Sequence, residues 1–116
     1  MSPDDACRVS TAERDGRLVV CLTGELDVAV AGEVERAVNA AVAAAAAVVV
    51  DLDGLTFLDS AGVRVLDHLL GACYERGVPV RVVATPGSPA AFTLRVCAFP
   101  DHVMCASTDE ALADLP

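Results

Sequence analysis

Large aromatic side chains are scarce in this sequence. Its 116 residues include no Trp, one Tyr and three Phe, and aromatic residues make up 3% of the chain. We therefore expect no aromatic cage for a ligand, and the core must be built from Val, Leu and Ala. Hydrophobic residues still account for 54% of the chain. A chain of this length fits one domain, which would bury roughly two-thirds of the surface exposed on unfolding.

Basic residues are also few. Eight of them stand against 17 acidic residues, which leaves a net charge of −9. A field of that sign repels phosphate backbones and anionic lipids, so direct binding to nucleic acid is not expected. The opening residues 1–5 lack the basic and apolar regions of a secretion signal, and the longest apolar run, 40–50, is shorter than the roughly 20 residues of a spanning helix. These absences predict a cytoplasmic protein without membrane insertion.

Paired cysteines and metal-binding motifs are absent as well. The five cysteines are odd in number and widely spaced and contain no Cys-x-x-Cys pair, which argues against a disulfide framework and a zinc knuckle. We interpret them as small core residues, and we interpret the two isolated histidines as surface residues. No metal and no cofactor is expected. The cysteines are Cys7, Cys21, Cys73, Cys97 and Cys105, and the histidines are His68 and His102.

Strand and helix signals alternate along the chain. The turn at 13–16 suits a hairpin, and the apolar run at 18–22 stops at Thr23-Gly24. In the Ala-rich segment that follows, Val34, Val38 and Val42 form the apolar stripe of a helix. Asp53-Gly54 resembles a turn, so we interpret 53–58 as the loop leaving a valine-rich strand. The predicted strands are 7–12, 18–22, 48–52, 78–84 and 103–106, and the predicted helices are 31–47, 60–76, 89–97 and 109–115.

This order of elements predicts an α/β fold. After an opening hairpin, alternating strands and helices favour a mixed, largely parallel sheet of about five strands, with about four helices packed on it. Gly77 suits a left-handed C-cap, Ser88 an N-cap before Pro89, and 107–110 a capping box. No linker or repeat interrupts the pattern, so we expect one domain over residues 1–116.

Two loops are the candidate sites, because ligands of α/β sheets bind beyond the carboxyl ends of the strands. They are 24–27, Gly-Glu-Leu-Asp, and 55–62, which ends in Asp59-Ser-Ala-Gly62. From the residues alone, Ser60 is interpreted as an N-cap whose hydroxyl bonds the free N–H groups of the helix. Gly62 costs the helix about 1 kcal/mol relative to Ala, and it bares the backbone for close approach by another molecule.

These segments resemble the STAS family, specifically bacterial anti-sigma factor antagonists. The resemblance rests on 24–27, the Ala-rich helix, the valine strand ending at Asp51-Leu52, the segment Phe-Leu-Asp-Ser-Ala-Gly-Val at 57–63 and the closing 108–112. It implies that an anti-sigma factor, itself a serine protein kinase, phosphorylates Ser60. The unphosphorylated protein would bind that factor and free a sigma factor, and a phosphatase of the PP2C type would reverse the modification. The candidate partner-binding residues are Glu25, Asp27, Asp59, Ala61, Gly62 and Arg64.

The chain departs from the family pattern at two places. Many relatives carry a second Ser or Thr where this chain has Ala61, which leaves Ser60 as the only hydroxyl of the Asp-Ser-Ala-Gly segment at 59–62. Relatives also tend to begin the first helix with Thr-Ala-Pro, whereas the matching residues here are Val-Ala-Gly at 30–32. The sequence thus predicts a missing N-cap hydroxyl and an apolar side chain, Val30, near the interface. Arg64 is expected to pair with Asp67 or to face a partner.

A physical account of the switch accompanies the resemblance. A phosphate adds about −1.5 to −2 charge, which the dipole and free N–H groups of a helix N-terminus tolerate, while a partner would have to desolvate it beside Asp59. The main alternative is a STAS scaffold subunit that is never phosphorylated, in a lipid-transport or stress-signalling complex. Small-ligand binding is less favoured because the loops hold no Gly-rich phosphate cradle. Catalysis is not expected, since no histidine can be placed as a base beside Ser60.

Overall fold

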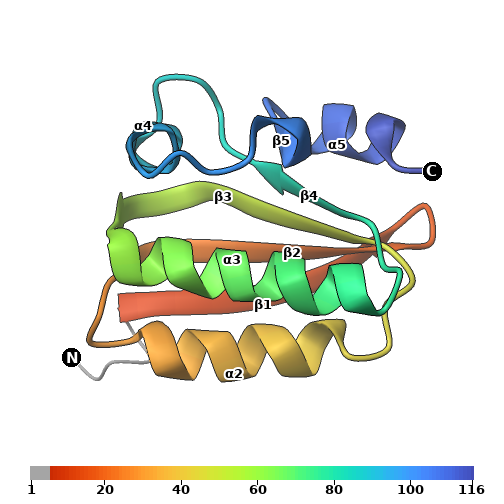
Figure 1. Cartoon of the computed structure of the whole chain (residues 1–116), viewed down its shortest axis with the longest axis horizontal. Coiled ribbons are helices and arrows are strands. Elements are labelled where there is room, and N and C mark those ends of the chain that lie inside the picture. The colour runs from red at the N-terminus through yellow and green to blue at the C-terminus, as the bar shows by residue number, and fades with distance from the viewer. Residues whose placement is uncertain (1–5) are drawn as a thin grey trace.

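Five strands form one sheet, in the order β1-β2-β3-β4-β5. A computed structural model describes residues 6–116, and Figure 1 shows its helices packed against this sheet. The strands are β1 Cys7–Arg14, β2 Arg17–Leu26, β3 Val48–Leu58, β4 Val80–Val83 and β5 Met104–Cys105, and the helices are α2 Ala31–Val42, α3 Ser60–Glu75, α4 Pro89–Val96 and α5 Thr108–Asp114.

The pairing of the strands confirms the predicted fold class. β1 and β2 are antiparallel, and the pairs from β2 to β5 are parallel. Asp15 and Gly16 make the hairpin turn with positive φ angles of 53° and 79°. The predicted caps also form: Ser88 accepts a hydrogen bond from Ala91 N, and Ser107 accepts one from Glu110 N.

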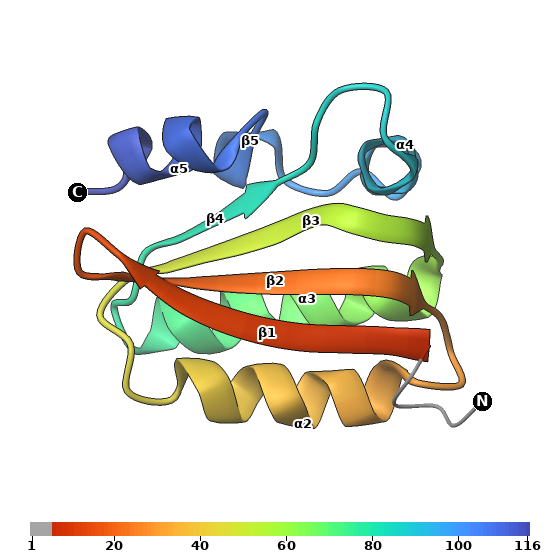
Figure 2. The same cartoon turned by 180° about the vertical axis from the view of Figure 1, so that it is seen from behind.

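Helices cover the two faces of the sheet unequally. α2 and α3 lie side by side on one face, and Figure 2 shows the opposite face, with β1, β2 and β3 in front of α3. α5 packs on that opposite face against Val49 and Val83. α4 is short.

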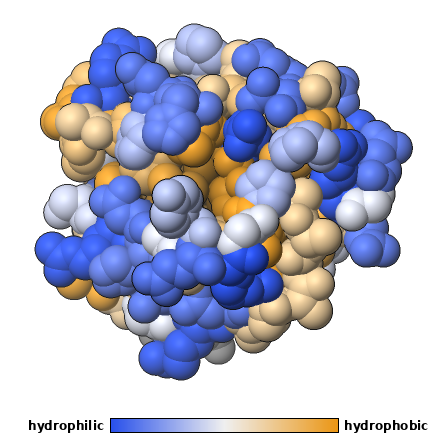
Figure 3. Space-filling model, turned by 45° about the vertical axis from the view of Figure 1, so that its right-hand side comes forward, coloured by the Kyte–Doolittle hydropathy of each residue, from blue (hydrophilic) through white to orange (hydrophobic). Residues whose placement is uncertain are grey.

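A hollow of about 410 Å³ lies open beside β4. Leu70, Tyr74, Val103 and their neighbours line it. Figure 3 shows apolar side chains gathered in a hollow on this side of the molecule.

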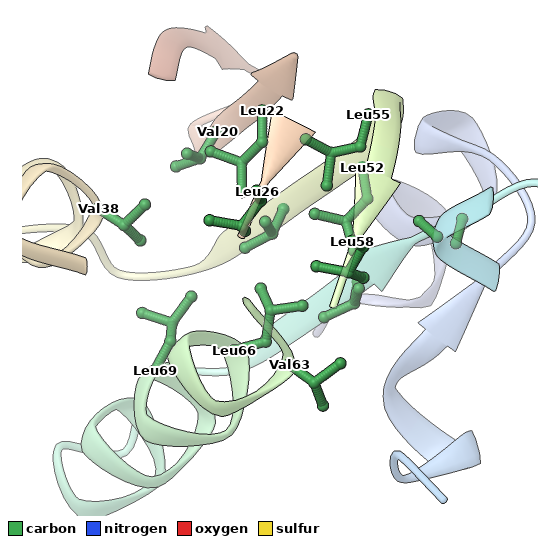
Figure 4. Close-up of a cluster of buried hydrophobic side chains, with 14 of the residues drawn as sticks. Val20, Leu22, Leu26, Val38, Leu52, Leu55, Leu58, Val63, Leu66 and Leu69 are labelled. Carbon is green, nitrogen blue, oxygen red and sulfur yellow. The ribbon is translucent and has the colours of Figure 1, made fainter. Parts of the chain in front are cut away.

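Aliphatic side chains fill the main core. The predicted stripe of α2 is buried at Val34, Val38 and Val42. Figure 4 shows Val38 of α2 and Leu66 and Leu69 of α3 pointing toward leucines of the strands. At roughly 25 cal/mol per Å² of apolar surface removed from water, this burial is the main source of stability of the fold.

Three strands are longer than predicted, and the first of them, β1, extends past residue 12 to Arg14. β2 continues through Gly24 to Leu26, and β3 continues through Gly54 to Leu58, so the predicted loop at 53–58 is wrong. Gly54 lies opposite Thr23, where the pairing shifts register. A Cβ on Gly54 would come within 2.5 Å of the Thr23 methyl group. Gly54 therefore serves a close strand approach and not a turn.

The first long helix is shorter than predicted. α2 ends at Val42 and not at Ala47, because Ala47 is buried against the sheet and its carbonyl accepts a hydrogen bond from Leu18 N. The guanidinium of Arg76 donates to the carbonyls of Val42 and Ala43, at 3.3 and 2.8 Å. A cation on the last carbonyls of a helix stabilises its end, so α2 stops where α3 supplies this contact. β5 is likewise shorter than the predicted 103–106.

The cysteines follow the prediction in part. Cys7, Cys73 and Cys105 are buried and Cys21 is half-buried, but Cys97, just after α4, is exposed, which corrects its interpretation as a core residue. All five are free thiols. Burial raises the pKa of Cys7, Cys21, Cys73 and Cys105 above the ordinary thiol value. Both histidines are exposed, as predicted.

Three further predictions concern membrane spans, metal sites and the opening segment of the chain. Between residues 6 and 116, no helix has the length and apolar character needed to cross a membrane. The same range holds no group of three or more His, Cys, Asp or Glu side chains arranged for a metal ion. The acidic opening segment, on which the expected lack of a secretion signal depends, lies outside the described residues.

Candidate functional site

The candidate site lies where β2 and β3 end side by side. Leu26 pairs with Leu58 at the last rung of the parallel ladder, and Asp59 N donates to Leu26 O at 3.3 Å. The turn into α2 and the first turn of α3 therefore meet at one end of the sheet, on the left in Figure 1. This is the edge at which parallel α/β sheets place their sites, as the sequence predicted.

Asp59 is the N-cap of α3, which corrects the interpretation of Ser60 as the capping residue. Asp59 Oδ1 accepts hydrogen bonds from Ala61 N at 2.9 Å and Gly62 N at 3.1 Å. Its other oxygen, Oδ2, accepts one from Val28 N at 3.3 Å. One carboxylate thus holds the start of α3 and the β2–α2 turn together.

Ser60 is consequently left with a free hydroxyl. It is the first residue of α3, its side chain is exposed, and across residues 6–116 its hydroxyl makes no hydrogen bond. A hydroxyl in this position is accessible to another protein. Its replacement or modification also removes no contact from the fold.

The helix N-terminus offers less to a phosphate than the sequence predicted. The N–H groups of Ala61 and Gly62 already bond Asp59 Oδ1, and Val63 N bonds the Asp59 carbonyl at 3.1 Å. The expectation that free N–H groups would receive the phosphate is therefore wrong for these three. A phosphate on Ser60 would lie at the surface, next to the Asp59 carboxylate.

Gly62 has a different purpose from the predicted one. It is buried, and a Cβ there would come within 2.8 Å of Leu26 Cγ and would also overlap Leu58 Cδ1. The close approach is made by side chains of the same chain and not by another molecule. This internal packing explains the glycine, and a contact of Gly62 with a partner stays a prediction.

The two acidic residues of the first loop differ in their roles. Glu25 is exposed at the end of β2, opposite Phe57. Asp27 is half-buried, its Oδ1 accepts a hydrogen bond from Ala29 N at 3.0 Å, and its carbonyl accepts bonds from Val30 N and Ala31 N. Asp27 thus shapes the entry into α2, whereas the Glu25 side chain is open to a partner.

Val30 and Arg64 also depart from the predictions. Val30 is the N-cap of α2 and makes no side-chain capping bond, as predicted. It is only 3% exposed, however, so it is not the apolar side chain at the surface. That side chain is Val28, which is 77% exposed. Arg64 is exposed, and within residues 6–116 it forms no ion pair, so the expected pair with Asp67 is absent. Its guanidinium lies one turn after Ser60, on the same side of α3.

Sequence reasoning missed the contribution of α4. Thr93 Oγ1 donates to Leu58 O at 2.9 Å, which places α4 beside the end of β3. Phe92 and Val96 of this helix are exposed. Their spacing of four residues was a signal for one face of a helix, but nothing in the sequence placed this helix beside the end of β3.

The comparisons agree with this fold. The sequence pattern of the STAS domain matches residues 8–112. The chain superimposes on the crystal structure of an anti-sigma factor antagonist from Mycobacterium paratuberculosis with a TM-score of 0.77, at 28% identity over 97% of both chains. No curated protein matches the sequence.

Two further structures share the fold at lower identity. SpoIIAA, an anti-sigma factor antagonist from Bacillus solved in its unphosphorylated form, has a TM-score of 0.73 and 17% identity over 92% of this chain and 94% of its own. An RsbS variant from Moorella thermoacetica has a TM-score of 0.73 and 21% identity over 91% of this chain and 92% of its own.

Proposed function

This chain belongs to the STAS domain family, and we propose that it is an anti-sigma factor antagonist. In this proposal it binds an anti-sigma factor that is a serine protein kinase, and so releases a sigma factor to direct transcription. Phosphorylation of Ser60 by that kinase ends the binding, and a phosphatase of the PP2C type restores it. The protein acts in the cytoplasm by binding alone and catalyses no reaction.

One observation carries this proposal: the Ser60 hydroxyl is exposed at the start of α3 and forms no hydrogen bond with any residue from 6 to 116. It is in this state because Asp59 provides the cap that a serine at a helix start often provides. The likeness to the Mycobacterium paratuberculosis antagonist over nearly all of both chains supports the same assignment.

The proposed switch acts through charge at the interface. A phosphate adds about −1.5 to −2 charge beside the Asp59 carboxylate, and the nearest helix N–H groups are already occupied. A bound partner would have to desolvate both negative groups, which costs several kcal/mol when they are unpaired. A loss of about 4 kcal/mol weakens association roughly a thousandfold. The fold survives, because the Ser60 hydroxyl holds no hydrogen bond within the described structure.

The exposure of each candidate side chain indicates whether it can contact the partner. Glu25 and Arg64 are exposed and form no ion pair within residues 6–116, and Ala61 leaves the segment 59–62 with one hydroxyl. Asp59 and Asp27 contribute by shaping the two loops. We therefore assign a positioning role to Asp27 and Asp59, and direct contact with the partner to Glu25 and Arg64.

The test uses three serine variants. Ser60→Ala should bind the anti-sigma kinase that phosphorylates the wild type with unchanged Kd, while Ser60→Asp should bind about 10- to 100-fold more weakly in calorimetry. Ser10→Asp, which adds the same charge at an exposed position of β1, is the matched control and should bind normally. Mass spectrometry after incubation with ATP and the kinase should find phosphate on Ser60 alone.

Two results would contradict the proposal. Binding of Ser60→Asp as tight as that of the wild type would exclude the charge mechanism. An absence of phosphate on Ser60 with every anti-sigma kinase of the organism would favour the unphosphorylated scaffold instead.

A further inference from the structure

Several large apolar side chains are exposed on the segments that meet at the end of the sheet that carries Ser60. They are Val28 at 77%, Phe57 at 48%, Phe92 at 66% and Val96 at 69%. The chain has only three Phe, and two of them are on this surface. Scattered exposed apolar residues are ordinary, but a group of them beside a site marks an interaction surface. We call these four residues the apolar surface.

Hydrogen bonds and strand pairing bring the segments that carry these four residues to one end of the molecule. Phe57 lies two residues before Asp59, and Val28 N bonds Asp59 Oδ2 at 3.3 Å. Phe92 precedes Thr93, whose Oγ1 bonds Leu58 O at 2.9 Å, and Val96 follows one helical turn later. Figures 1 and 2 agree in placing α4, the end of β3 and the start of α3 together.

We propose that the apolar surface is the docking site of the anti-sigma kinase, with Phe92 and Val96 of α4 as its anchors. This inference rests on the proposed function and extends the interface from the Ser60 loop to a helix that the sequence did not associate with it. Any protein that transfers a phosphoryl group to the Ser60 hydroxyl has to cover the side chains beside it. Exposed aromatic residues at the centre of such a contact supply most of its binding energy.

The charges around the apolar surface indicate the chemistry of this partner. The same segments carry three acidic residues, Glu25, Asp27 and Asp59, and two basic ones, Arg64 and Arg95. The chain as a whole carries −9. A second copy would bring the same negative charge, which opposes self-association. The complementary occupant is a protein with an apolar pocket for α4 and a predominantly basic rim.

The hollow beside β4 provides the matched control. It is apolar too, and Tyr74 on its rim is 86% exposed. It lies toward the other end of α3, away from Ser60. Tyr74→Ala therefore removes an exposed aromatic side chain of similar size without touching the apolar surface.

The experiment compares variants of the full chain for binding to the anti-sigma kinase that phosphorylates the wild type. Phe92→Ala should raise Kd about 30-fold or more, Val96→Ala should raise it less, and Tyr74→Ala should leave it within about threefold. Because Ser60 itself is unchanged, Phe92→Ala should raise KM for Ser60 phosphorylation and leave kcat unaltered. Circular dichroism should show native structure in each variant, since these side chains are exposed.

The outcomes separate this inference from the proposed function. A wild type that binds and is phosphorylated, together with a Phe92→Ala, Val96→Ala double variant of equal affinity, would overturn the docking surface and leave the function standing. An equal loss from Tyr74→Ala would also overturn it. A wild type that binds no anti-sigma kinase would overturn both.

Discussion

Two glycines of the same helix receive opposite predictions for the same substitution. Gly62 and Gly71 both lie within α3. Gly71 is exposed, and a Cβ there meets nothing within 4 Å. Gly62 is buried, and a Cβ there overlaps Leu58 and comes within 2.8 Å of Leu26 Cγ.

The expected magnitudes follow from these surroundings. Replacing Gly by Ala within a helix stabilises it by up to about 1 kcal/mol, so Gly71→Ala should raise the free energy of unfolding by that amount. At Gly62 the same gain is opposed by overpacking, which costs about 1–3 kcal/mol where side chains cannot move away. Leu26 and Leu58 are 0% and 4% exposed, so neither has free space to enter. The net effect of Gly62→Ala should be a loss of up to about 2 kcal/mol.

Urea unfolding followed by far-ultraviolet circular dichroism measures both variants on one scale. The two should differ by about 1–3 kcal/mol, and their melting temperatures by about 4–12 °C, because 1 kcal/mol corresponds to roughly 4 °C in a domain of this size. Equal stabilisation by both substitutions would refute the reasoning, since it would mean that the two leucines repack around a methyl group at no cost. The helix propensity of Ala would then be the only effect at work.

Three further predictions concern the cap, the thiols and the core. Asp59→Ala should lower the free energy of unfolding by about 1–2 kcal/mol through loss of the N-cap, while Asp59→Asn should keep most of it; equal losses in urea unfolding would contradict the capping role. At pH 8, iodoacetamide should label Cys97 far faster than the other four thiols, whose raised pKa lowers their thiolate fraction at that pH; mass spectrometry showing equal labelling in the native protein would exclude this. Val38→Ala should cost about 2–3 kcal/mol, whereas Val28→Ala, at an exposed position, should change stability by less than about 0.5 kcal/mol; thermal unfolding compares the two.

Local patterns in the sequence were sufficient for most of the fold. The stripe of Val34, Val38 and Val42 identified a helix, and the valine-rich run at 48–50 identified a central strand. Each signal depends on side chains within a few residues of one another, so it is present before any tertiary contact forms. The predicted boundaries were wrong where tertiary contacts decide them. Gly54 is read locally as a turn, but strand pairing with Thr23 makes it part of β3.

For the candidate site, too, some features were determined by the sequence and others only by the tertiary structure. The sequence by itself determined that an acidic residue and a serine would stand at the start of α3, because the apolar period of the helix begins just after them. Only the tertiary structure decided which of them caps the helix, since Asp59 is also bonded from Val28 N in the β2–α2 turn, 31 positions away along the chain. Tertiary structure likewise decided that Gly62 faces Leu26 and that α4 lies beside the end of β3. Local patterns record propensity and periodicity, whereas such contacts depend on how the whole sheet brings distant segments together.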